Sequence, residues 1–273
     1  MQPDAVRQMW AAGDYTSFGD LFASVGPSLV KQVGVAGLDV LDVATGTGNT
    51  ALAAARAGGR VTGMDITPEL LAVARKRAAA QALEVTWIEG DMRKLDFPDA
   101  SFDRALSTFG TMTAPEPAAM AAELLRVCRP RGLVATTAWS ADAAMSRLGD
   151  VVARFFPSPQ GATGGGSAPY VPRHNPTDWA RPERVAEFFA GLRANVTSVE
   201  RSVTIRWASV EAATTMVTTT CGPLLGAVAA LRNDGRWPQA RAAIADMLAA
   251  RNRADDGSLT INMPYLVVIA RPS

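Results

Sequence analysis

The stretch Leu38-Asp39-Val40-Leu41-Asp42-Val43-Ala44-Thr45-Gly46-Thr47-Gly48-Asn49 decides how this chain of 273 residues folds. Up to Val43 it is a nearly continuous apolar run, which is typical of a strand buried on both faces of a parallel sheet. Two glycines follow in the pattern Gly46-x-Gly48-x-x-Ala51, where glycine lets the backbone bend tightly and approach a ligand closely. A helix that begins at this point presents unpaired backbone N–H groups to that ligand. The stretch therefore predicts a ligand-binding turn between a strand and a helix.

Strands and helices alternate beyond this turn. We expect helices at residues 49–57, 68–82 and 116–129, and strands at residues 60–65, 84–89, 102–108 and 133–139. Thr67, Pro68 and Glu69 mark the start of the helix at 68–82, and Pro130 and Gly132 mark the end of the helix at 116–129. Parallel strands joined by crossovers of ordinary length indicate a doubly wound α/β sheet.

The alternation breaks after Trp139. We expect a helix at 142–155, a long loop at 157–177, a helix at 182–191, a strand at 196–207, two or three helices within 209–254, and a strand at 259–270. If the strands near 200 and 265 pair, the helices between them form an insertion above the sheet. The glycine- and proline-rich loop has the length of a segment that covers a site.

Composition and charge exclude several classes of protein. The chain is 48% apolar and has 27 Lys+Arg against 26 Asp+Glu, so it resembles neither a disordered protein nor a basic nucleic-acid-binding protein. Its two cysteines, Cys128 and Cys221, give no disulfide framework. It contains no apolar run of membrane-spanning length and no secretory signal. We therefore expect a cytoplasmic protein that acts on a small molecule, without nucleic acid, membrane or metal as partner, and the sequence allows a homodimer.

Two aspartates stand where a nucleoside needs acceptors. Asp65 ends the second strand 19 residues after Gly46, where a carboxylate can accept hydrogen bonds from both ribose hydroxyls. A charge at the helix N-terminus near Thr67 is the alternative for Asp65. Asp91 follows the third strand, where it can accept from an adenine amino group while Met92 covers the ring. A surface-turn aspartate is the alternative for Asp91.

The glycine pattern alone also fits a dinucleotide-dependent dehydrogenase. Hydride transfer in such enzymes needs further catalytic groups, and the tyrosines Tyr15, Tyr170 and Tyr265 form no Tyr-x-x-x-Lys pair. Titration with NAD tests this interpretation.

Taken in order, the motifs resemble those of class I S-adenosylmethionine-dependent methyltransferases, of the small-molecule type related to the ubiquinone and menaquinone methyltransferases. The matching segments are Val40–Gly48, Val61–Thr67, Gly90–Met92, Phe97–Asp103 and Leu124–Pro130, within residues 38–140. The chain departs from the family at Ala44, where a glycine is usual, and at Arg131, where the family's Pro-Gly-Gly turn has a glycine.

The resemblance implies a Rossmann-like seven-stranded sheet, mostly parallel, with an antiparallel last strand and a helical cap. It also implies one domain, 1–273, in which 1–35 form a helical lid, 36–140 bind the cofactor, 141–208 and 209–257 form the cap, and 258–273 form the last strand. S-adenosylmethionine would be the cofactor and S-adenosylhomocysteine the product. The residues implied to bind the cofactor are Tyr15, Asp42, Ala44, Thr45, Gly46, Thr47, Gly48, Asp65, Ile66, Gly90, Asp91, Met92, Ser107, Thr108 and Phe109.

The acceptor side is less constrained by sequence. Methyl transfer from a sulfonium depends mainly on orientation, which lowers barriers by roughly 7–11 kcal/mol in favourable cases, and it needs a base only when the acceptor arrives protonated. His174, the only histidine, is the candidate base, and an exposed loop histidine is the alternative. Six residues are candidates for an apolar acceptor pocket, with plain core as the alternative: Trp139, Phe155, Phe156, Trp179, Trp207 and Met216.

The sequence thus predicts methyl transfer to an oxygen, nitrogen or carbon atom of a small organic acceptor, in bacterial specialised metabolism. The alternative is a protein of the same fold that binds S-adenosylmethionine but catalyses another reaction, such as a cyclisation, or acts as a binding module.

Overall fold

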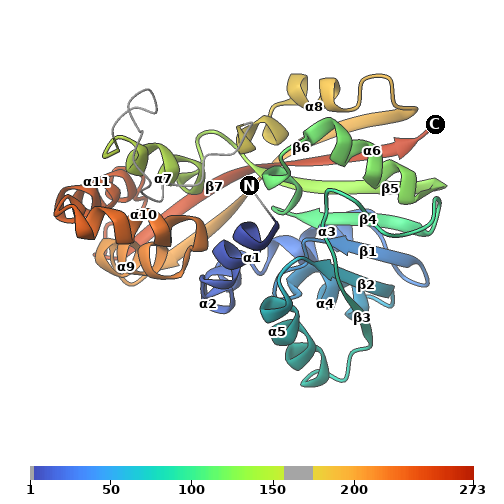
Figure 1. Cartoon of the computed structure of the whole chain (residues 1–273), viewed down its shortest axis with the longest axis horizontal. Coiled ribbons are helices and arrows are strands. Elements are labelled where there is room, and N and C mark those ends of the chain that lie inside the picture. Colours follow the sequence, from blue (N-terminus) through green and yellow to red (C-terminus); the bar gives the residue numbers. More distant parts are fainter. Residues whose placement is uncertain (1–2, 157–174) are drawn as a thin grey trace.

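A seven-stranded sheet forms the centre of the molecule, for which the computed structural model describes residues 3–156 and 175–273 (Figure 1). The strands stand in the order β3-β2-β1-β4-β5-β7-β6. Their bounds are β1 Asp39–Val43, β2 Arg60–Asp65, β3 Val85–Glu89, β4 Phe102–Thr108, β5 Cys128–Trp139, β6 Ala194–Trp207 and β7 Leu259–Pro272. Neighbouring strands are parallel except at β7, which runs antiparallel to both β5 and β6. The predicted fold class is confirmed.

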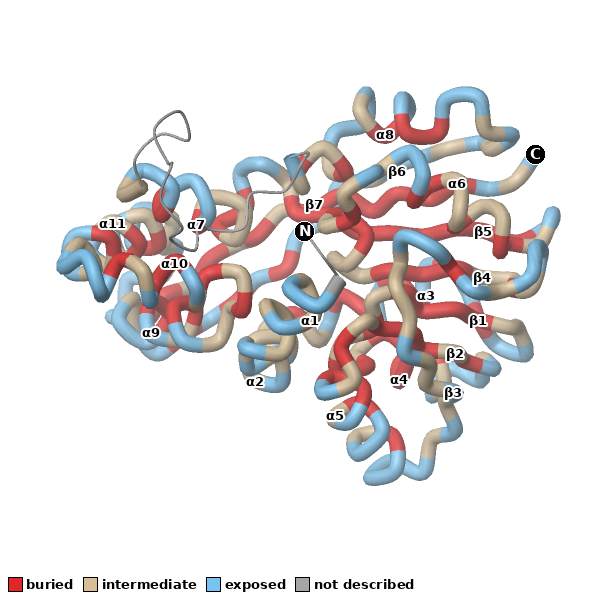
Figure 2. Tube along the Cα trace, in the orientation of Figure 1, coloured by how far each residue is buried: buried red, intermediate tan, exposed pale blue. Residues whose placement is uncertain are grey.

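The core lies along the central strands. Val40, Leu41 and Val43 of β1 are wholly buried, as the apolar run predicts. The tube is mostly red, and so buried, along β1, β4 and β5, whereas the first half of β6 is pale blue and tan, and so exposed or half-buried (Figure 2). Helices α4 (Asn49–Arg56) and α5 (Pro68–Ala79) lie against β1–β3, and α6 (Pro117–Val127) lies against β4 and β5. The elements in this half begin and end within a few residues of the predicted positions, except at the start of β5.

Strand β5 begins at Cys128 and not at residue 133 as predicted. Helix α6 ends at Val127 because the carbonyls of Arg126 and Val127 accept hydrogen bonds from the backbone N–H groups of Ala100 and Ser101. The ladder between β4 and β5 is irregular here, since Cys128 lies opposite Phe102 while Leu133 lies opposite Arg104. Pro130 and Gly132 therefore lie inside β5, in this bulge, and the helix ends three residues before Pro130.

The cap is built at one end of two long strands. Strands β6 and β7 pair over their full length, from Ala194 opposite Pro272 to Trp207 opposite Leu259, which confirms the pairing expected near residues 200 and 265. Between them the chain forms α9 (Val210–Thr220), α10 (Gly222–Asn233) and α11 (Trp237–Ala249), which gather with α7 (Ala144–Ala153) at the left of Figure 1. The short helices η3 (Pro176–Ala180) and α8 (Pro182–Phe188) lie beside the sheet. Most of the predicted loop at 157–177 lies outside the described residues.

Three helices lie in the part of the chain, 1–35, that was predicted to form a helical lid: α1 (Pro3–Ala11), α2 (Tyr15–Asp20) and α3 (Val25–Val33). Helix α3 packs against α4 and contributes Leu29 and Val30 to the core. Helix α1 contacts α10, and α2 contacts α9, so both lie between the cap and the sheet (Figure 1). Within the described ranges, no single helix has both the length and the apolar character needed to cross a membrane, although α9 and α10 together pass that test as a pair bent by 97°.

Candidate functional site

Asp65 joins the carboxyl ends of β1 and β2. Its Oδ2 atom accepts a hydrogen bond from the backbone N–H of Gly46 at 2.8 Å, and its Oδ1 atom accepts from the N–H of Thr67 at 2.9 Å. Burial raises the pKa of the Asp65 carboxyl above its ordinary value, although the two backbone N–H groups act in the opposite direction. The contact with Thr67 is the one expected of the helix-terminus alternative, and the contact with Gly46 brings the same carboxylate to the glycine turn.

Asp42 holds that turn from inside the sheet. Its Oδ2 atom accepts from the Thr45 hydroxyl at 2.6 Å and from the backbone N–H of Ala51 at 3.0 Å, so one oxygen fixes both the turn and the first part of α4. Burial raises the pKa of Asp42 to about 7. Both contacts hold the glycine turn and the start of α4 in place.

The glycine turn combines left-handed backbone, which glycine adopts readily, with open space. Gly46 has φ +56°, and an added Cβ would meet nothing within 4 Å, so its Cα faces open space. Gly48 has φ +87°, and a Cβ there would lie 2.9 Å from the indole of Trp87, which also lies 2.6 Å from the Cβ position of Gly63. The Trp87 ring of β3 therefore packs against the backbone of the glycine turn at Gly48. Sequence alone does not identify Trp87 and Gly63 as supports of the glycine turn, because only the fold brings them beside it.

Ala44 has φ +55°, a conformation in which glycine is usual. Its methyl group fits because residue 110 is a glycine: a Cβ on Gly110 would lie 2.5 Å from the Ala44 Cβ. The departure from the family pattern at Ala44 is therefore matched by a glycine after β4.

The turn after β3 holds Gly90, Asp91 and Met92. Gly90 packs against Met64, since an added Cβ would lie 2.8 Å from its sulfur. Asp91 forms an ion pair with Arg93 and also accepts from the Arg93 backbone N–H at 2.9 Å. Partial burial favours a higher pKa of the Asp91 carboxyl, but the contacts from Arg93 hold that pKa below its ordinary value. These contacts are those of the surface-turn alternative. Met92, the next residue, and Ile66, which follows β2, are half-buried.

The carboxyl end of β4 is tied to β1 and α4. The buried Ser107 hydroxyl donates to the Val43 carbonyl at 2.8 Å and accepts from the Thr111 N–H at 3.1 Å. The hydroxyls of Thr108 and Thr50 lie 2.8 Å apart. Both predicted hydroxyls are therefore engaged within the protein and fix the end of β4.

An aromatic cluster, which we define as Phe22, Phe109, Trp139 and Tyr265, lies at the end of β4 and β5. Phe109 has φ +60°, and its ring stacks on Trp139 with 3.7 Å between centroids. Phe22 and Tyr265 meet both rings edge-on. Tyr15 and Phe18 of α2 extend the ring contacts toward Phe22.

The six predicted pocket residues are not brought to one place. Trp139 lies opposite Tyr265, which lies opposite Arg201, whereas Trp207 lies six residues further along β6, roughly 20 Å at 3.3 Å per residue. Trp207 donates from Nε1 to the Met216 sulfur at 3.3 Å, so these two residues belong to the cap.

Trp179 is wholly buried and packs on Phe188 and Phe189, as in the core alternative. Phe155 and Phe156 are half-buried after α7, where Arg236 donates to the Phe155 carbonyl and lies over the Phe156 ring. The candidate base His174 lies outside the described residues.

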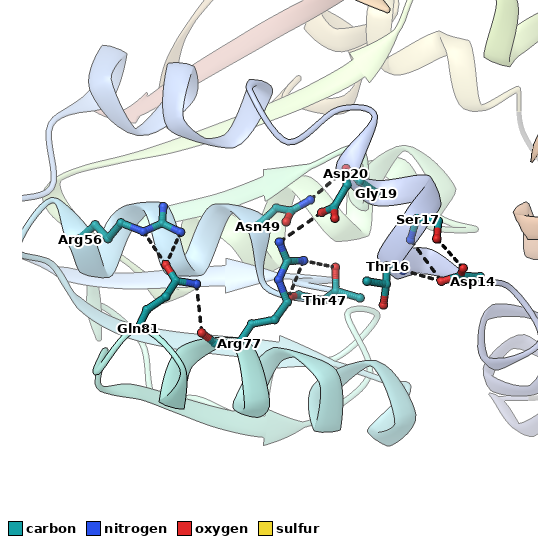
Figure 3. A network of polar contacts seen from close by, with 10 residues as sticks. All are labelled: Asp14, Thr16, Ser17, Gly19, Asp20, Thr47, Asn49, Arg56, Arg77 and Gln81. Atoms are coloured by element: carbon teal, nitrogen blue, oxygen red, sulfur yellow. Dashed lines mark hydrogen bonds and ion pairs between the residues drawn. The ribbon is translucent and has the colours of Figure 1, made fainter. Parts of the chain in front are cut away.

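Two further features lie on helices α2 and α5. The hydroxyl of Tyr15 is buried and donates no hydrogen bond to the described residues. Burial raises the pKa of Tyr15 well above its ordinary value, although the backbone N–H of Gly222 acts in the opposite direction. Arg77 of α5 donates to the Thr47 hydroxyl at 3.0 Å and to Asp20 of α2 at 3.2 Å (Figure 3). Arg77 and Asp20 were not identified from the sequence, because they lie far from the turn along the chain.

Comparison with known sequences agrees with this geometry. A family model described as a methyltransferase domain matches residues 40–132. An uncharacterized protein of Mycobacterium tuberculosis is 45% identical over 159 residues, which are 57% of this chain and 58% of that protein. Demethylmenaquinone methyltransferase of Thermus thermophilus is 39% identical over 127 residues (46% and 50%), and phosphatidylethanolamine N-methyltransferase of Cereibacter sphaeroides is 37% identical over 140 residues (49% and 68%). The chain spans little more than half the length of the first of these relatives.

Solved structures share the fold at low sequence identity. The YcgJ protein of Bacillus subtilis has a TM-score of 0.60 at 16% identity, covering 92% of this chain and 99% of its own. The cyclase SpnF has a TM-score of 0.52 at 17% identity (92% and 80%), and geranyl diphosphate C-methyltransferase of Streptomyces coelicolor, solved with S-adenosyl-L-homocysteine, has 0.53 at 14% (92% and 79%). The named sequence relatives decide against the dehydrogenase alternative. The chain belongs to the class I S-adenosylmethionine-dependent methyltransferases.

Proposed function

We propose that this protein transfers a methyl group from S-adenosylmethionine to an oxygen, nitrogen or carbon atom of a small organic acceptor. The observation that carries the proposal is the bridge from Asp65 to Gly46, beside the open space at the Gly46 backbone. In open α/β sheets, ligands bind at the carboxyl ends of the strands where the strand order reverses, which here is between β1 and β4.

The residues of the site fit an adenosyl ligand. A carboxylate has about four acceptor positions, so Asp65 keeps acceptor capacity for ribose hydroxyls after taking one N–H on each oxygen. The hydroxyl of Tyr15, which donates to no described residue, is a donor of the kind that the carboxylate of the methionine moiety needs. The glycine turn supplies backbone groups beside the open space at Gly46.

When bound, the sulfonium supplies a methyl group that is already activated. The chain then needs to exclude water and hold the acceptor in line. The aromatic cluster is suited to both tasks, since Phe22, Trp139 and Tyr265 are buried and surround Phe109 at the end of β4. We keep His174 as the proposed base for an acceptor that arrives protonated.

Titration calorimetry with S-adenosylhomocysteine tests the cofactor part of the proposal. We expect binding by the unaltered protein and about 10- to 100-fold weaker binding by Asp65→Ala, because hydrogen bonds to a charged group contribute about 1.5–3 kcal/mol. Asp150→Ala, at an exposed aspartate of α7, is the matched control. A protein that binds NAD and not S-adenosylhomocysteine would contradict the proposal.

Isotope-labelled S-adenosylmethionine tests the transfer itself. Incubation with a panel of phenols, amines and enolisable ketones should yield an acceptor that carries the labelled methyl group. Cofactor binding without any transfer would favour the cyclisation or binding-module alternative.

A further inference from the structure

We propose that α2 is a latch over the cofactor and that Arg77 is the positioning residue that fastens it, so that this latch limits how fast the cofactor leaves. The proposal rests on the proposed function, because it takes the glycine turn as the cofactor site. We call the contacts of Asp20, Arg77 and Thr47 the latch.

Arg77 joins the turn to α2 with one guanidinium group. Its Nη1 atom donates to the Thr47 hydroxyl at 3.0 Å and lies 3.4 Å from the Thr47 carbonyl oxygen, and its Nη2 atom donates to Asp20 at 3.2 Å (Figure 3). Thr47 is 5% exposed, so this end of the guanidinium is buried while the Asp20 end faces solvent. A rigid planar fork can serve two acceptors at a fixed spacing, which a lysine ammonium cannot do as well.

A second contact lies beside the first. Asn49, the first residue of α4, donates from Nδ2 to the Gly19 carbonyl at 3.0 Å (Figure 3). Neighbouring residues of α2 are therefore attached to both sides of Gly48. Because these partners are distant in sequence, each contact holds α2 on the turn and does not merely stabilise the helix.

Helix α2 is short and only partly buried. It is six residues long and contains no residue that is buried as a whole, although Asp14 caps its first turn through the N–H groups of Thr16 and Ser17 (Figure 3). Its Tyr15 and Phe18 rings pack on each other, and Phe18 also packs on Phe22. An isolated helix of this length is not stable in water. Segments with few buried contacts open at low free-energy cost, so loss of the polar contacts with the turn should make α2 open more often.

The other side of α2 faces the cap. Helix α2 contacts α9, and α1 contacts α10 while its Arg7 pairs with Glu69 and Glu89 at the cofactor edge. An open α2 would uncover the turn and separate the cap from the sheet at the same place. Release of the cofactor should therefore follow the opening of α2.

The test compares release rates of S-adenosylhomocysteine, measured by stopped-flow displacement. Asp20→Ala and Arg77→Lys should release it about three- to tenfold faster than the unaltered protein, because each loses an exposed charged contact. Asp20→Glu, which keeps a carboxylate at this position, should release S-adenosylhomocysteine about as slowly as the unaltered protein. Arg56→Lys is the matched control: Arg56 bonds Gln81 of α5 at 2.6 and 2.8 Å and makes no described contact with α2 or Thr47.

Hydrogen exchange of the α2 backbone provides a readout that needs no ligand. In the free protein, residues 15–20 should exchange faster in Asp20→Ala than in the unaltered protein or in Arg56→Lys. Unchanged exchange and release in Asp20→Ala, with cofactor binding intact, would overturn the latch alone. Failure of the unaltered protein to bind S-adenosylhomocysteine would overturn the proposed function and the latch with it.

Discussion

Asp42 is a buried acid whose carboxylate holds the glycine turn. Burial raises its pKa to about 7, whereas an aspartate in an unfolded chain titrates near 3.9. The folded state therefore holds the proton more tightly than the unfolded state, and stability falls as pH rises from about 4 to about 7. The Asp65 carboxyl, whose pKa burial also raises, acts in the same direction.

We predict that Asp42→Asn removes part of this pH dependence. One amide oxygen can still accept from Thr45 and Ala51, since both bonds go to one atom of Asp42. Urea unfolding between pH 5 and 8 should show a shallower loss of stability in the variant, which becomes the more stable protein at pH 8. Parallel pH profiles for the two proteins would contradict a raised pKa at Asp42.

Gly110 should not tolerate even a methyl group. Gly110→Ala would bring a Cβ to 2.5 Å from the Ala44 Cβ and 2.8 Å from the Ser107 hydroxyl, and overpacking of this kind costs about 1–3 kcal/mol. Gly149→Ala, where a Cβ meets nothing within 4 Å on α7, is the control and should be neutral or stabilising. Ala44→Gly should recover part of the loss in the double variant, as measured by thermal unfolding.

The sequence predicted those site residues whose neighbours lie close along the chain or at a fixed spacing from the glycine turn. Asp42, Gly46 and Asp65 are of this kind: the structure joins Gly46 to Asp65 by a hydrogen bond, and Asp42 accepts from Thr45 and Ala51 on either side of the glycines. Trp87, Arg77 and Gly110 are not, because their contacts depend on how strands and helices stack. The ribose and adenine roles of Asp65 and Asp91 stay predictions.

At the scale of elements, the segment between β3 and β4 has no regular structure of its own and is held by Arg126 of α6. The Arg126 guanidinium donates to the carbonyls of Leu95 and Phe97, each at 2.7 Å, and pairs with Glu123 and Asp99. This segment follows Asp91 and Met92, so its position also fixes the turn proposed to contact adenine.

We predict that Arg126→Ala destabilises the protein by about 1–3 kcal/mol, because it leaves two carbonyls and a half-buried Glu123 without their charged donor. Arg126→Lys should recover only part, since an ammonium cannot span all these acceptors. Hydrogen exchange at residues 92–99 should rise in Arg126→Ala. Arg131→Ala, at an exposed arginine, serves as the control. An equal rise in hydrogen exchange at residues 92–99 in Arg131→Ala would contradict a specific role of Arg126.

The ends of helices were predictable where a residue close in sequence marks them. They were not predictable where contacts with a segment distant in sequence set them. Pro68 begins α5 as expected. The end of α6 was placed too late, because Pro130 and Gly132 look like a helix stop while the actual end depends on N–H groups of Ala100 and Ser101.

At the scale of the whole molecule, the paired strands β6 and β7 carry the cap beyond the sheet, and α1 and α2 fill the space between them (Figure 1). The doubly wound sheet was predictable, because crossover connections and the buried first strand leave few arrangements. The acceptor pocket was not, because apolar residues of the cap and of the core look alike in a sequence.

A ligand that binds only the folded chain should stabilise the whole molecule. S-adenosylhomocysteine at 100 times its Kd should add about 2.7 kcal/mol, or roughly 5–10 °C in Tm. Asp65→Ala at the same concentration should gain much less, and NAD should give no shift. An equal gain in Asp65→Ala would show that the ligand binds elsewhere.

The indole of Trp87 lies against the Cα positions of both Gly48 and Gly63. Its surroundings therefore change whenever the glycine turn shifts, even slightly. A variant that keeps only this tryptophan would carry a built-in optical reporter: its emission wavelength and quenching by iodide would follow occupancy of the turn without any attached dye.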